Sequence, residues 1–571
     1  MLSMRFFVLA LFPLSLALSG SAETPAPAQP AVAVTTHLVQ VSVVVHGRKD
    51  EPVLDLTKDD FEIRDSGASQ PIAAMSLEAT LGAPTEPLRA LPVNTFTNQP
   101  ELAPAHPQAV TAILLDGLNT KFEDQAQARR HLIQFLKELS PDNHVALFTL
   151  GTDLRLLYDF TSDAGPLLRR LNGTMPRIAT ELADSEFEDS DTGNKDFDNF
   201  FNNVNEHLAD FRTIDRVQTT LAAIEAIAEH AARIPGRKNL IWISGGFPFS
   251  IGLDGFNAIP TREQRTFGDE LERTARAVNA ANMAIYPVDA HGVTVDAQFS
   301  TASRGTTRAG APPRPSKSMS NLQNTQSAMH AIADRTGGRA YMNTNDLKSA
   351  IRRAIDDSQV TYVLSFYPNH QTWDGSWHPL KVSCARRGVE LHYRTGYFAF
   401  ADKPPAAEDR QTAIREAAWS PLDESTLGIT VRLVPHSPNP DMLHVAMRVA
   451  LQDVQMRRNN DRYEGALDIA YFRQGGPDEA PTITNNSVKI ALTQAQYDSY
   501  LKQGLFVLDD LKLAESAYRL KVIVRDATSG NTGSINIRTD KLKPNPPEAV
   551  PAPVPGAQKD SGGRVTGVSH D

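Results

Sequence analysis

Val110–Thr120, with the sequence VTAILLDGLNT, is the stretch from which the fold is inferred. Its unbroken apolar run is typical of a strand buried on both faces, as in a parallel sheet covered by helices. Asp116 ends that run, at the place where open α/β sheets bind their ligands. Asp116 and Thr120 can offer a carboxylate and a hydroxyl from one loop to a hard divalent cation. The alternative is that Asp116 only caps the helix that follows.

The composition is that of a multidomain globular protein. Of 571 residues, 41% are hydrophobic and 22% are charged, which is enough for several buried cores. The formal net charge of −10 argues against binding to nucleic acid or to an anionic membrane surface. Cys384 is the single cysteine, so the chain forms no intramolecular disulfide, and the alternating residues around it indicate a strand.

The amino terminus has the pattern of an export signal. Arg5 precedes the apolar run FFVLALFPLSLALSG, and small residues follow as far as Ala22. We therefore expect a secretory signal peptide over residues 1–22, with an uncleaved membrane anchor as the alternative. No later segment has about 20 consecutive apolar residues. We expect no transmembrane segment after signal cleavage, and a periplasmic or extracellular location.

Between residues 109 and 368, predicted strands alternate with predicted helices, one of them over Ile214–Ala232. Strands such as HVALFTLG, NLIWIS and MAIYPVD are separated by segments whose apolar residues recur at helical spacing. This order predicts βαβ units, a doubly wound, mostly parallel sheet and an α/β fold class, with Val360–Pro368 as the last strand. Two insertions interrupt it, an acidic one at 181–210, interpreted as a solvated loop, and a basic one at 295–320.

Predicted β modules flank this central domain. Alternating residues in LVQVSVVVHGRKDEPVLDLTKDDFEIRDSG indicate the first module, and two later strands, Leu380–Cys384 and Val389–Arg394, are expected to pair with it. Alternating segments near the end of the chain predict a β-sandwich of the immunoglobulin or fibronectin type. The predicted segments are a signal peptide (1–22), a linker (23–36), an N-terminal β module (37–81), a linker (82–108), the central domain (109–368), a β extension (369–402), a C-terminal β-sandwich (415–540) and a disordered tail (541–571).

Several of these segments together resemble a known family. They are VQVSVVVHGRKDEPVLDLTKDDFEIRDSG, ILLDGLNT, HVALFTLG, IPGRKNLIWISGGFP, IYPVDAHG, IADRTGGRAYMNTNDLKSAI, VTYVLSFYP and DGSWHPLKVSCARRGVELHYRTGYFA, in this order over residues 37–400. The chain is similar in them to the bacterial VWFA-related proteins, a branch of the von Willebrand factor A (VWA) superfamily first collected from acidobacterial genomes. The resemblance implies a Rossmann-like, VWA-like central domain that often binds Mg²⁺ at a metal-ion-dependent adhesion site (MIDAS).

The resemblance also assigns residues to that metal site, which usually combines an Asp-x-Ser-x-Ser loop, a threonine from a second loop and an aspartate after a later strand. Asp116 matches the first aspartate, and Thr120 can serve as the second hydroxyl. Leu118 stands at the first serine position and offers no ligand atom. Thr213 is the best match for the threonine, and Ser244 takes the place of the later aspartate. One carboxylate with two or three hydroxyls is a small set for a hard cation, so a bound Mg²⁺ and an absent one are both open.

The predicted binding face lies around these residues. Asp215 and Thr219 are near enough to compete with Thr213 as the ligand before the long helix. Asn119 and Asp215 are expected on the face that meets the partner. His291, two residues after Asp289, is interpreted as a polar residue at the rim rather than as a metal ligand.

We expect a binding protein and not an enzyme. Ser244 lacks the leading glycine of a nucleophile elbow, and no HExxH, P-loop or GxGxxG motif occurs. The expected function is protein–protein binding or adhesion, in which the central domain engages a protein or peptide ligand. One alternative is a structural or assembly component of the cell envelope without metal-dependent binding. A remote alternative is a secreted hydrolase.

Overall fold

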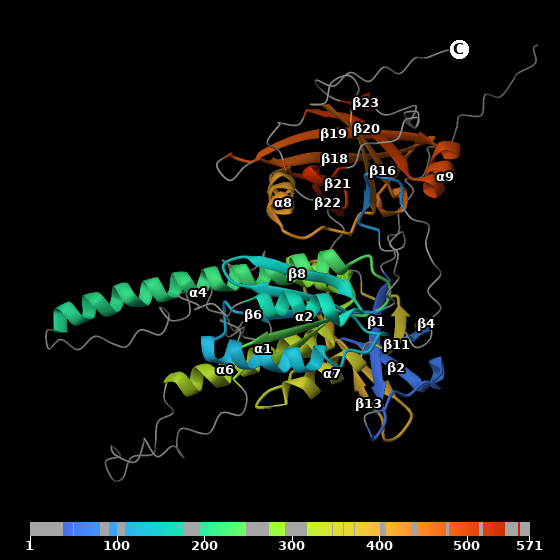
Figure 1. Cartoon of the computed structure of the whole chain (residues 1–571). Helices are drawn as coiled ribbons and strands as arrows, with labels where there is room; N and C mark the ends of the chain where they lie inside the picture. The colour runs from blue at the N-terminus through green and yellow to red at the C-terminus, as the bar shows by residue number, and fades with distance from the viewer. Residues whose placement is uncertain are drawn as a thin grey trace, which may run out of the picture. The chain divides into compact units, whose positions relative to one another are not determined.

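The computed structural model describes most of the chain from Leu38 onward. The predicted signal peptide, the first linker, most of the basic insertion and nearly all of the predicted tail lie outside the described residues. Within the described part the structure is mixed α/β, with helices and five sheets (Figure 1). The described residues are 38–49, 51–79, 91–99, 109–174, 195–246, 273–291, 317–344, 346–357, 359–370, 372–399, 407–435, 442–475, 479–512, 518–542 and 558–559.

The apolar runs of the central domain form a five-stranded sheet with the order β10-β9-β6-β7-β8. Neighbouring strands are parallel except in the β7–β8 hairpin. Every residue of β9 and β10 is buried, as are all but one of β6, which is why these strands show no alternation in the sequence. The strands are β6 (Val110–Asp116), β7 (His144–Leu150), β8 (Leu154–Thr161), β9 (Lys238–Ser244) and β10 (Met283–Asp289).

Helices cover both faces of this sheet. Ile113 and Ile241 belong to a buried cluster with residues of α1, α2 and α7. Leu114 and Trp242, the next residue in each strand, belong to a second cluster with residues of α4 and α6. Successive side chains of a strand point to opposite faces, so each strand contributes to both cores. The helices are α1 (Phe122–Leu136), α2 (Ala164–Gly173), α4 (Lys195–Ala231), α6 (Lys317–Thr336) and α7 (Leu347–Asp356).

Helix α4 corrects the interpretation of the acidic insertion. The helix includes residues 195–210, which the sequence analysis assigned to a solvated loop, and it begins well before the predicted start at Ile214. No glycine or proline interrupts Lys195–Ala231, so nothing in the sequence ends the helix early. None of the helices that the structure describes is both long enough and apolar enough to cross a membrane.

The strand β11 (Val360–Phe366) does not complete the parallel sheet, which is a second correction. It lies between β1 (Val39–His46) and β4 (Ile72–Ala79) and is antiparallel to both. Two antiparallel neighbours bury it as fully as a parallel sheet would, so its apolar sequence does not distinguish the two placements. At the edge of the central sheet, Tyr341 forms only an isolated parallel bridge with Val288.

The predicted pairing between the N-terminal module and the later strands is confirmed. The strand β12 (Trp377–Cys384) pairs with β2 (Phe61–Asp65), and β13 (Glu390–His392) pairs with β1. The sheets β13-β1-β11-β4 and β14-β12-β2-β3 share one buried cluster, so the small module is stabilised by chain that returns after the central domain. The remaining strands of this module are β3 (Ala68–Gln70) and β14 (Gly396–Phe398).

The C-terminal segments form two further sheets, β20-β16-β15-β5 and β22-β21-β18-β19-β23, which share a single hydrophobic cluster. The strand β5 (Thr95–Thr97) comes from the predicted linker at 82–108 and pairs with β15, so that linker is not structureless throughout. The other elements are α8 (Ala407–Trp419), β15 (Ile429–Pro435), β16 (Met442–Val449), β17 (Arg457–Asn459), β18 (Arg462–Gln474), β19 (Thr482–Thr493), α9 (Gln494–Gln503), β20 (Leu505–Lys512), β21 (Arg519–Asp526), β22 (Thr532–Arg538) and β23 (Gln558–Lys559).

Candidate functional site

Asp116 ends β6 at the carboxyl edge of the central sheet, but its side chain is turned inward and the residue is only 2% exposed. Its Oδ1 accepts a hydrogen bond from the backbone N–H of Asn119 at 3.0 Å. Its Oδ2 accepts three more at 2.9 Å, from the Asn119 amide, the Trp242 indole and the Ser244 hydroxyl. The carboxylate that was expected to be available to a cation is therefore enclosed, because neighbouring donors on β9 and in the loop surround it.

Asn119 links this carboxylate to α4. Its amide nitrogen also donates to the hydroxyl of Thr220 at 2.9 Å, and its Oδ1 accepts from Nε of Arg216 at 3.0 Å. Thr220 and Arg216 stand four residues apart on one face of the helix, and both are buried. The long helix thus contributes Thr220 to this network, where the sequence analysis expected Thr213.

The earlier start of α4 explains this difference. Thr213 was expected in a loop before the helix, but it lies inside α4, about two turns before Thr220. The side chain of Thr213 lies outside the described residues, so its role as a ligand stays a prediction. Asp215, one of its competitors and an expected partner contact, is exposed on the helix, and Thr219 is half-buried.

The loop between β6 and α1 is held in place at several points. The hydroxyl of Thr120 accepts from the backbone N–H of Gly245 at 2.8 Å, and the Gln125 amide donates to the carbonyl groups of Gly117 and Thr120. A Cβ atom at Gly245 would stand 2.8 Å from the backbone oxygen of Asn119, so only glycine allows this approach. Asp116, Asn119, Thr120 and Ser244 are therefore brought together, as the strand order predicts, but in a closed network.

This donor set does not fit Mg²⁺. Mg²⁺ takes about six oxygen ligands in near-ideal octahedral geometry. Here a single carboxylate already accepts four hydrogen bonds, and the Thr120 hydroxyl also has a backbone donor. Burial raises the pKa of Asp116, and the hydrogen bonds from Asn119, Trp242 and Ser244 oppose that rise. The network thus works as a structural support for the loop.

Imidazole and carboxylate groups that could hold a metal ion gather elsewhere among the described residues. The ligand atoms of Asp65, His370 and His378 all lie within 4.8 Å of one another. None of these residues belongs to the carboxyl edge of the central sheet.

The rim of the same edge carries a second polar group. His291 Nδ1 lies 2.8 Å from Oδ1 of Asp289, and its Nε2 lies 3.9 Å from Oδ2 of Asp124. The amide of Gln326 donates to the other oxygen of Asp289 at 3.1 Å. The hydrogen bond to Asp289 raises the pKa of His291, against the opposing effect of burial. His291 lies at the rim as predicted, held between two carboxylates.

One large apolar side chain stands out at this edge. Phe122 is the first residue of α1, immediately after the fixed loop, and its side chain is 47% exposed. Exposed aromatic groups on rigid supports are common anchors in protein–protein interfaces. The candidate site is thus a rigid polar loop with an exposed aromatic side chain beside it.

The network also contains three residues that were not predicted from the sequence, Trp242, Arg216 and Thr220. Arg216 and Thr220 interrupt an otherwise apolar helical stripe at a spacing of four residues, a signal that could have been used. Trp242 lies in a fully buried strand, where an indole normally indicates core packing only. Its N–H was therefore not assigned a partner.

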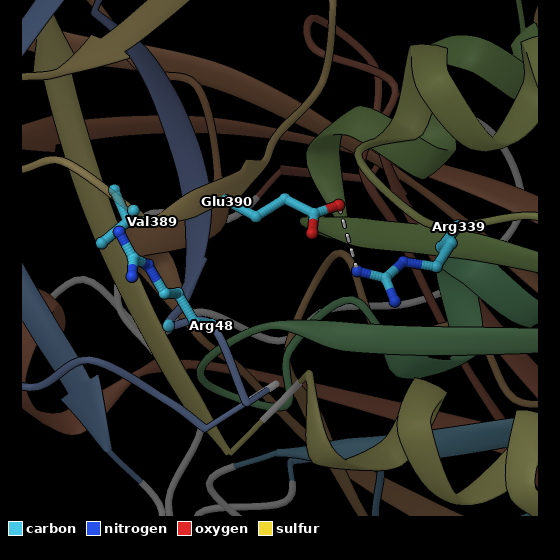
Figure 2. A pocket seen from close by; sticks show the side chains of 6 residues that line it. Arg48, Arg339, Val389 and Glu390 are labelled. Carbon is cyan, nitrogen blue, oxygen red and sulfur yellow. Dashed lines mark ion pairs between the residues drawn. The ribbon is translucent and has the colours of Figure 1, made fainter.

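A separate hollow of about 440 Å³ is lined by residues of the first β module, of the central domain and of the later β extension, namely Gly47, Arg48, Arg339, Gly388, Val389 and Glu390 (Figure 2). Figure 2 shows Arg339 reaching toward Glu390, with which it forms an ion pair at 3.6 Å. Glu390 offsets one of the two guanidinium charges, so the lining has only a small excess of positive charge. The hollow shares no residue with the network around Asp116.

Neither a protein-family model nor a curated protein matches the sequence. Among solved structures, the chain is similar to an aerotolerance-related membrane protein from Bacteroides fragilis, at 14% identity over 43% of this chain and 98% of that one, with a TM-score of 0.23. It is similar to the vWF domain of a type V pilus tip protein from Porphyromonas gingivalis, at 13% identity over 25% and 39% of the two chains, with a TM-score of 0.16.

A third similar structure is proximal thread matrix protein 1 from the mussel byssus with a zinc-occupied MIDAS motif. The identity is 11%, the coverage is 47% of this chain and 49% of that chain, and the TM-score is 0.24. The solved structures similar to this chain thus include von Willebrand factor A domains. Likenesses at such TM-scores are too remote to carry an argument about function.

Proposed function

We propose that this chain is an exported, VWA-related binding protein that engages a protein or peptide ligand through the carboxyl edge of its central sheet. Parallel strands with helices on both faces support a doubly wound, VWA-like central domain. Two C-terminal sheets around one core support a flanking β-sandwich. The signal-like sequence over residues 1–22 supports export to the periplasm or the cell exterior.

The observation that carries the proposal is the fixed loop ending at Phe122. Hydrogen bonds from Gln125 and Gly245 hold the loop, and Asn119 ties it to Asp116 and α4. A surface that is already ordered loses little conformational entropy when a partner binds. Phe122 offers that partner an apolar anchor, and binding needs no metal ion at Asp116.

The geometry gives no support to a catalytic role at this edge. Ser244 is fully buried, and its hydroxyl contacts the Asp116 carboxylate at 2.9 Å and the Gly246 carbonyl at 2.8 Å. A nucleophile needs an approach path and a base that takes its proton. The buried Ser244 hydroxyl has no approach path for a substrate, so we propose binding without catalysis.

The second candidate function is that of a structural or assembly component of the envelope. The burial of Asp116 favours it, because the network then serves only packing within the chain. The two functions differ in what meets Phe122. In a binding protein, Phe122 contacts another protein. In a structural component, another part of the same chain covers Phe122.

Site-specific photo-crosslinking distinguishes these functions. A benzophenone side chain replaces Phe122 in the full chain, and in a matched variant it replaces Tyr367, which has a similar exposure of 51%. After illumination in an envelope extract, we expect a discrete crosslinked protein from position 122 only, unchanged by EDTA. Crosslinks to the chain itself support the structural component, and identical patterns from both positions contradict the proposed face.

A further inference from the structure

Asp65, His370 and His378 form a compact group in the N-terminal module. Asp65 is the last residue of β2, His378 is near the start of β12, and His370 lies in the segment between β11 and β12. Asp65 precedes the central domain in the sequence, whereas both histidines follow its parallel sheet. The fold therefore brings together residues that are about 300 positions apart, as their ion-pair distances show.

Strand pairing fixes two members of the group. Asp65 lies opposite Leu380 in the β2–β12 pair, so His378, two residues before Leu380, is its diagonal neighbour on the same face. In the β12–β14 pair, Tyr397 lies directly opposite His378. The backbone thus holds a carboxylate, an imidazole and a phenol on one side of the sheet, and His370 completes the group from the connecting segment.

The distances within the group are close to those of a metal-ligand set. His378 Nδ1 lies 3.4 Å from Asp65 Oδ1, and His370 Nε2 lies 3.9 Å from Asp65 Oδ2. A tetrahedral zinc ion with bonds of about 2.0–2.1 Å keeps its ligand atoms about 3.3 Å apart. Small rotations of the two imidazole side chains are enough to bring the three ligand atoms to that spacing.

Burial and charge make this group suitable for a cation. The Asp65 side chain is 2% exposed, while those of His370 and His378 are 18% and 14% exposed, so the imidazoles cover the carboxylate and still reach solvent. The two rings are stacked with centroids 3.9 Å apart. Neutral imidazole nitrogen is the form that binds metal ions.

We infer that Asp65, His370 and His378 form a binding site for a divalent transition-metal ion, of which Zn²⁺ is the best match. Two imidazoles and one carboxylate are a common set of three protein ligands for zinc, with the fourth position left to water. Mg²⁺ prefers oxygen ligands only and is a poor match.

Tyr397 acts as a positioning residue in this site. Its hydroxyl donates to Asp65 Oδ2 at 2.8 Å and lies 2.7 Å from His370 Nε2. Hydrogen bonds to a ligating carboxylate orient it and tune its affinity for the metal. When the ion is bound, His370 turns from the phenol to the metal, and the phenol keeps its bond to Asp65.

The bound ion joins two distant parts of the sequence. Asp65 belongs to the first β module, and the histidines belong to chain that returns after the central domain, so the ion closes a loop of about 300 residues. A ligand that binds only the folded state stabilises it by mass action. Zinc therefore stabilises the N-terminal module in particular.

The test uses the full-length chain without an affinity tag, stripped of metal with a chelating resin. Zn²⁺ and, separately, Mg²⁺ are titrated by calorimetry, and Co²⁺ serves as an absorbance probe of tetrahedral coordination. We expect one Zn²⁺ per chain, no heat from Mg²⁺, and a Co²⁺ spectrum with intense visible bands. His370→Ala and His378→Ala should abolish the Co²⁺ bands, and Tyr397→Phe should weaken Zn²⁺ binding about 10- to 100-fold.

His444→Ala is the matched control, because His444 also pairs with an aspartate, Asp510, but in the C-terminal sheets. It should bind Zn²⁺ as the wild type does. Melting curves of the metal-free proteins show whether each variant folds, and His370, which lies outside the strands, is the substitution least disruptive to the fold. The inference is overturned if the wild type binds no Zn²⁺, or if folded His370→Ala binds it with unchanged affinity and spectrum.

Discussion

The imidazole of His230, near the end of α4, lies 3.0 Å from the carboxylate of Asp159 on β8, and its other ring nitrogen lies 2.8 Å from the backbone oxygen of Asp423. Both ring nitrogens thus face acceptors, which suits a doubly protonated ring. Burial by itself lowers the pKa of His230, but the charge and the hydrogen bond of Asp159 outweigh it, and the pKa is raised to about 9.

The His230–Asp159 pair predicts a loss of stability in mildly alkaline solution. The folded state holds the His230 proton up to about pH 9, whereas the unfolded state releases it near pH 6.5. The stabilisation of the folded state by protonated His230 is therefore complete below pH 6.5 and is lost as the pH rises to about 9. Because the Asp159 side chain is 54% exposed, solvent screening limits the effect to about 1–2 kcal/mol.

The measurement is urea unfolding of wild type and His230→Gln between pH 6 and pH 9.5. We expect the free energy of unfolding of the wild type to decrease over this interval more steeply than that of the variant. Parallel curves would show that the ring does not carry a proton in the folded state. His444→Gln is a control, because His444 is more exposed and pairs with Asp510 in another sheet.

A group of acids near the end of α4, of which Glu424 is buried and Glu225 and Glu229 are half-buried, predicts a second pH effect. Burial raises the pKa of Glu225 to about 7 and that of Glu424 to about 7, and it raises the pKa of Glu229 well above its usual value. Their mutual repulsion adds to the rise, while Arg273 and Lys521 oppose it. Protonation of Glu225 and of Glu424 favours the folded state, and this contribution to stability is complete below about pH 4.5 and is lost as the pH rises through about 7. The same direction holds for Glu229.

Glu229→Gln should therefore raise the melting temperature at pH 8 and change it little at pH 5. The substitution replaces a half-buried carboxylate, whose ionisation is unfavourable beside Glu424 and Glu225, with a neutral amide of the same shape. Glu123→Gln, at an exposed position on α1, is the control and should shift neither temperature. A melting temperature of Glu229→Gln below that of wild type at pH 8 would show that the acid makes a favourable contact in its charged form.

The network around Asp116 predicts a stability loss that does not depend on metal. In Asp116→Ala, the donors of Asn119, Trp242 and Ser244 lose a common buried acceptor, which should cost about 3 kcal/mol in urea unfolding. Mg²⁺ and Mn²⁺ should leave the melting temperature of the wild type unchanged. A metal-dependent rise in the wild type that disappears in Asp116→Ala would restore the adhesion-site interpretation.

The backbone of β10 leaves no space for a side chain at Gly338. A Cβ atom at this position would lie 2.0 Å from the backbone oxygen of Ile285, and no side-chain rotation relieves that overlap. We expect Gly338→Ala to lower the free energy of unfolding by at least about 2 kcal/mol. A Cβ at Gly151 meets no atom within 4 Å, so Gly151→Ala should change it by less than about 0.5 kcal/mol. Equal effects of the two substitutions would contradict this packing.

Much of the central sheet could be predicted because each of its buried parallel strands is a recognisable apolar run in the sequence. The apolar runs end at Asp116, Ser244 and Asp289, and the carboxyl ends of parallel strands meet at one edge. The direction of the Asp116 side chain could not be predicted, since it depends on whether Trp242 uses its N–H within the sheet. The choice of Thr220 over Thr213 depends on where α4 begins, and no breaker residue marks that point.

The group of Asp65, His370 and His378 could not be predicted from the sequence for a different reason. The pairing of the later strands with the first module was predicted, but a strand pair places side chains only when its register is known. A shift of one residue would turn His378 to the opposite face and separate it from Asp65. His370 lies in a connecting segment, where no periodicity indicates a direction.

Two strands made early in synthesis, β1 and β5, pair with strands that are made much later. Val39 pairs with Phe366, and Thr97 pairs with Thr430, so each early strand waits for a neighbour made more than three hundred residues later. Contacts so distant in sequence form slowly, and unpaired edges are open to aggregation until they close. A chain truncated before β15 therefore leaves β5 without its partner.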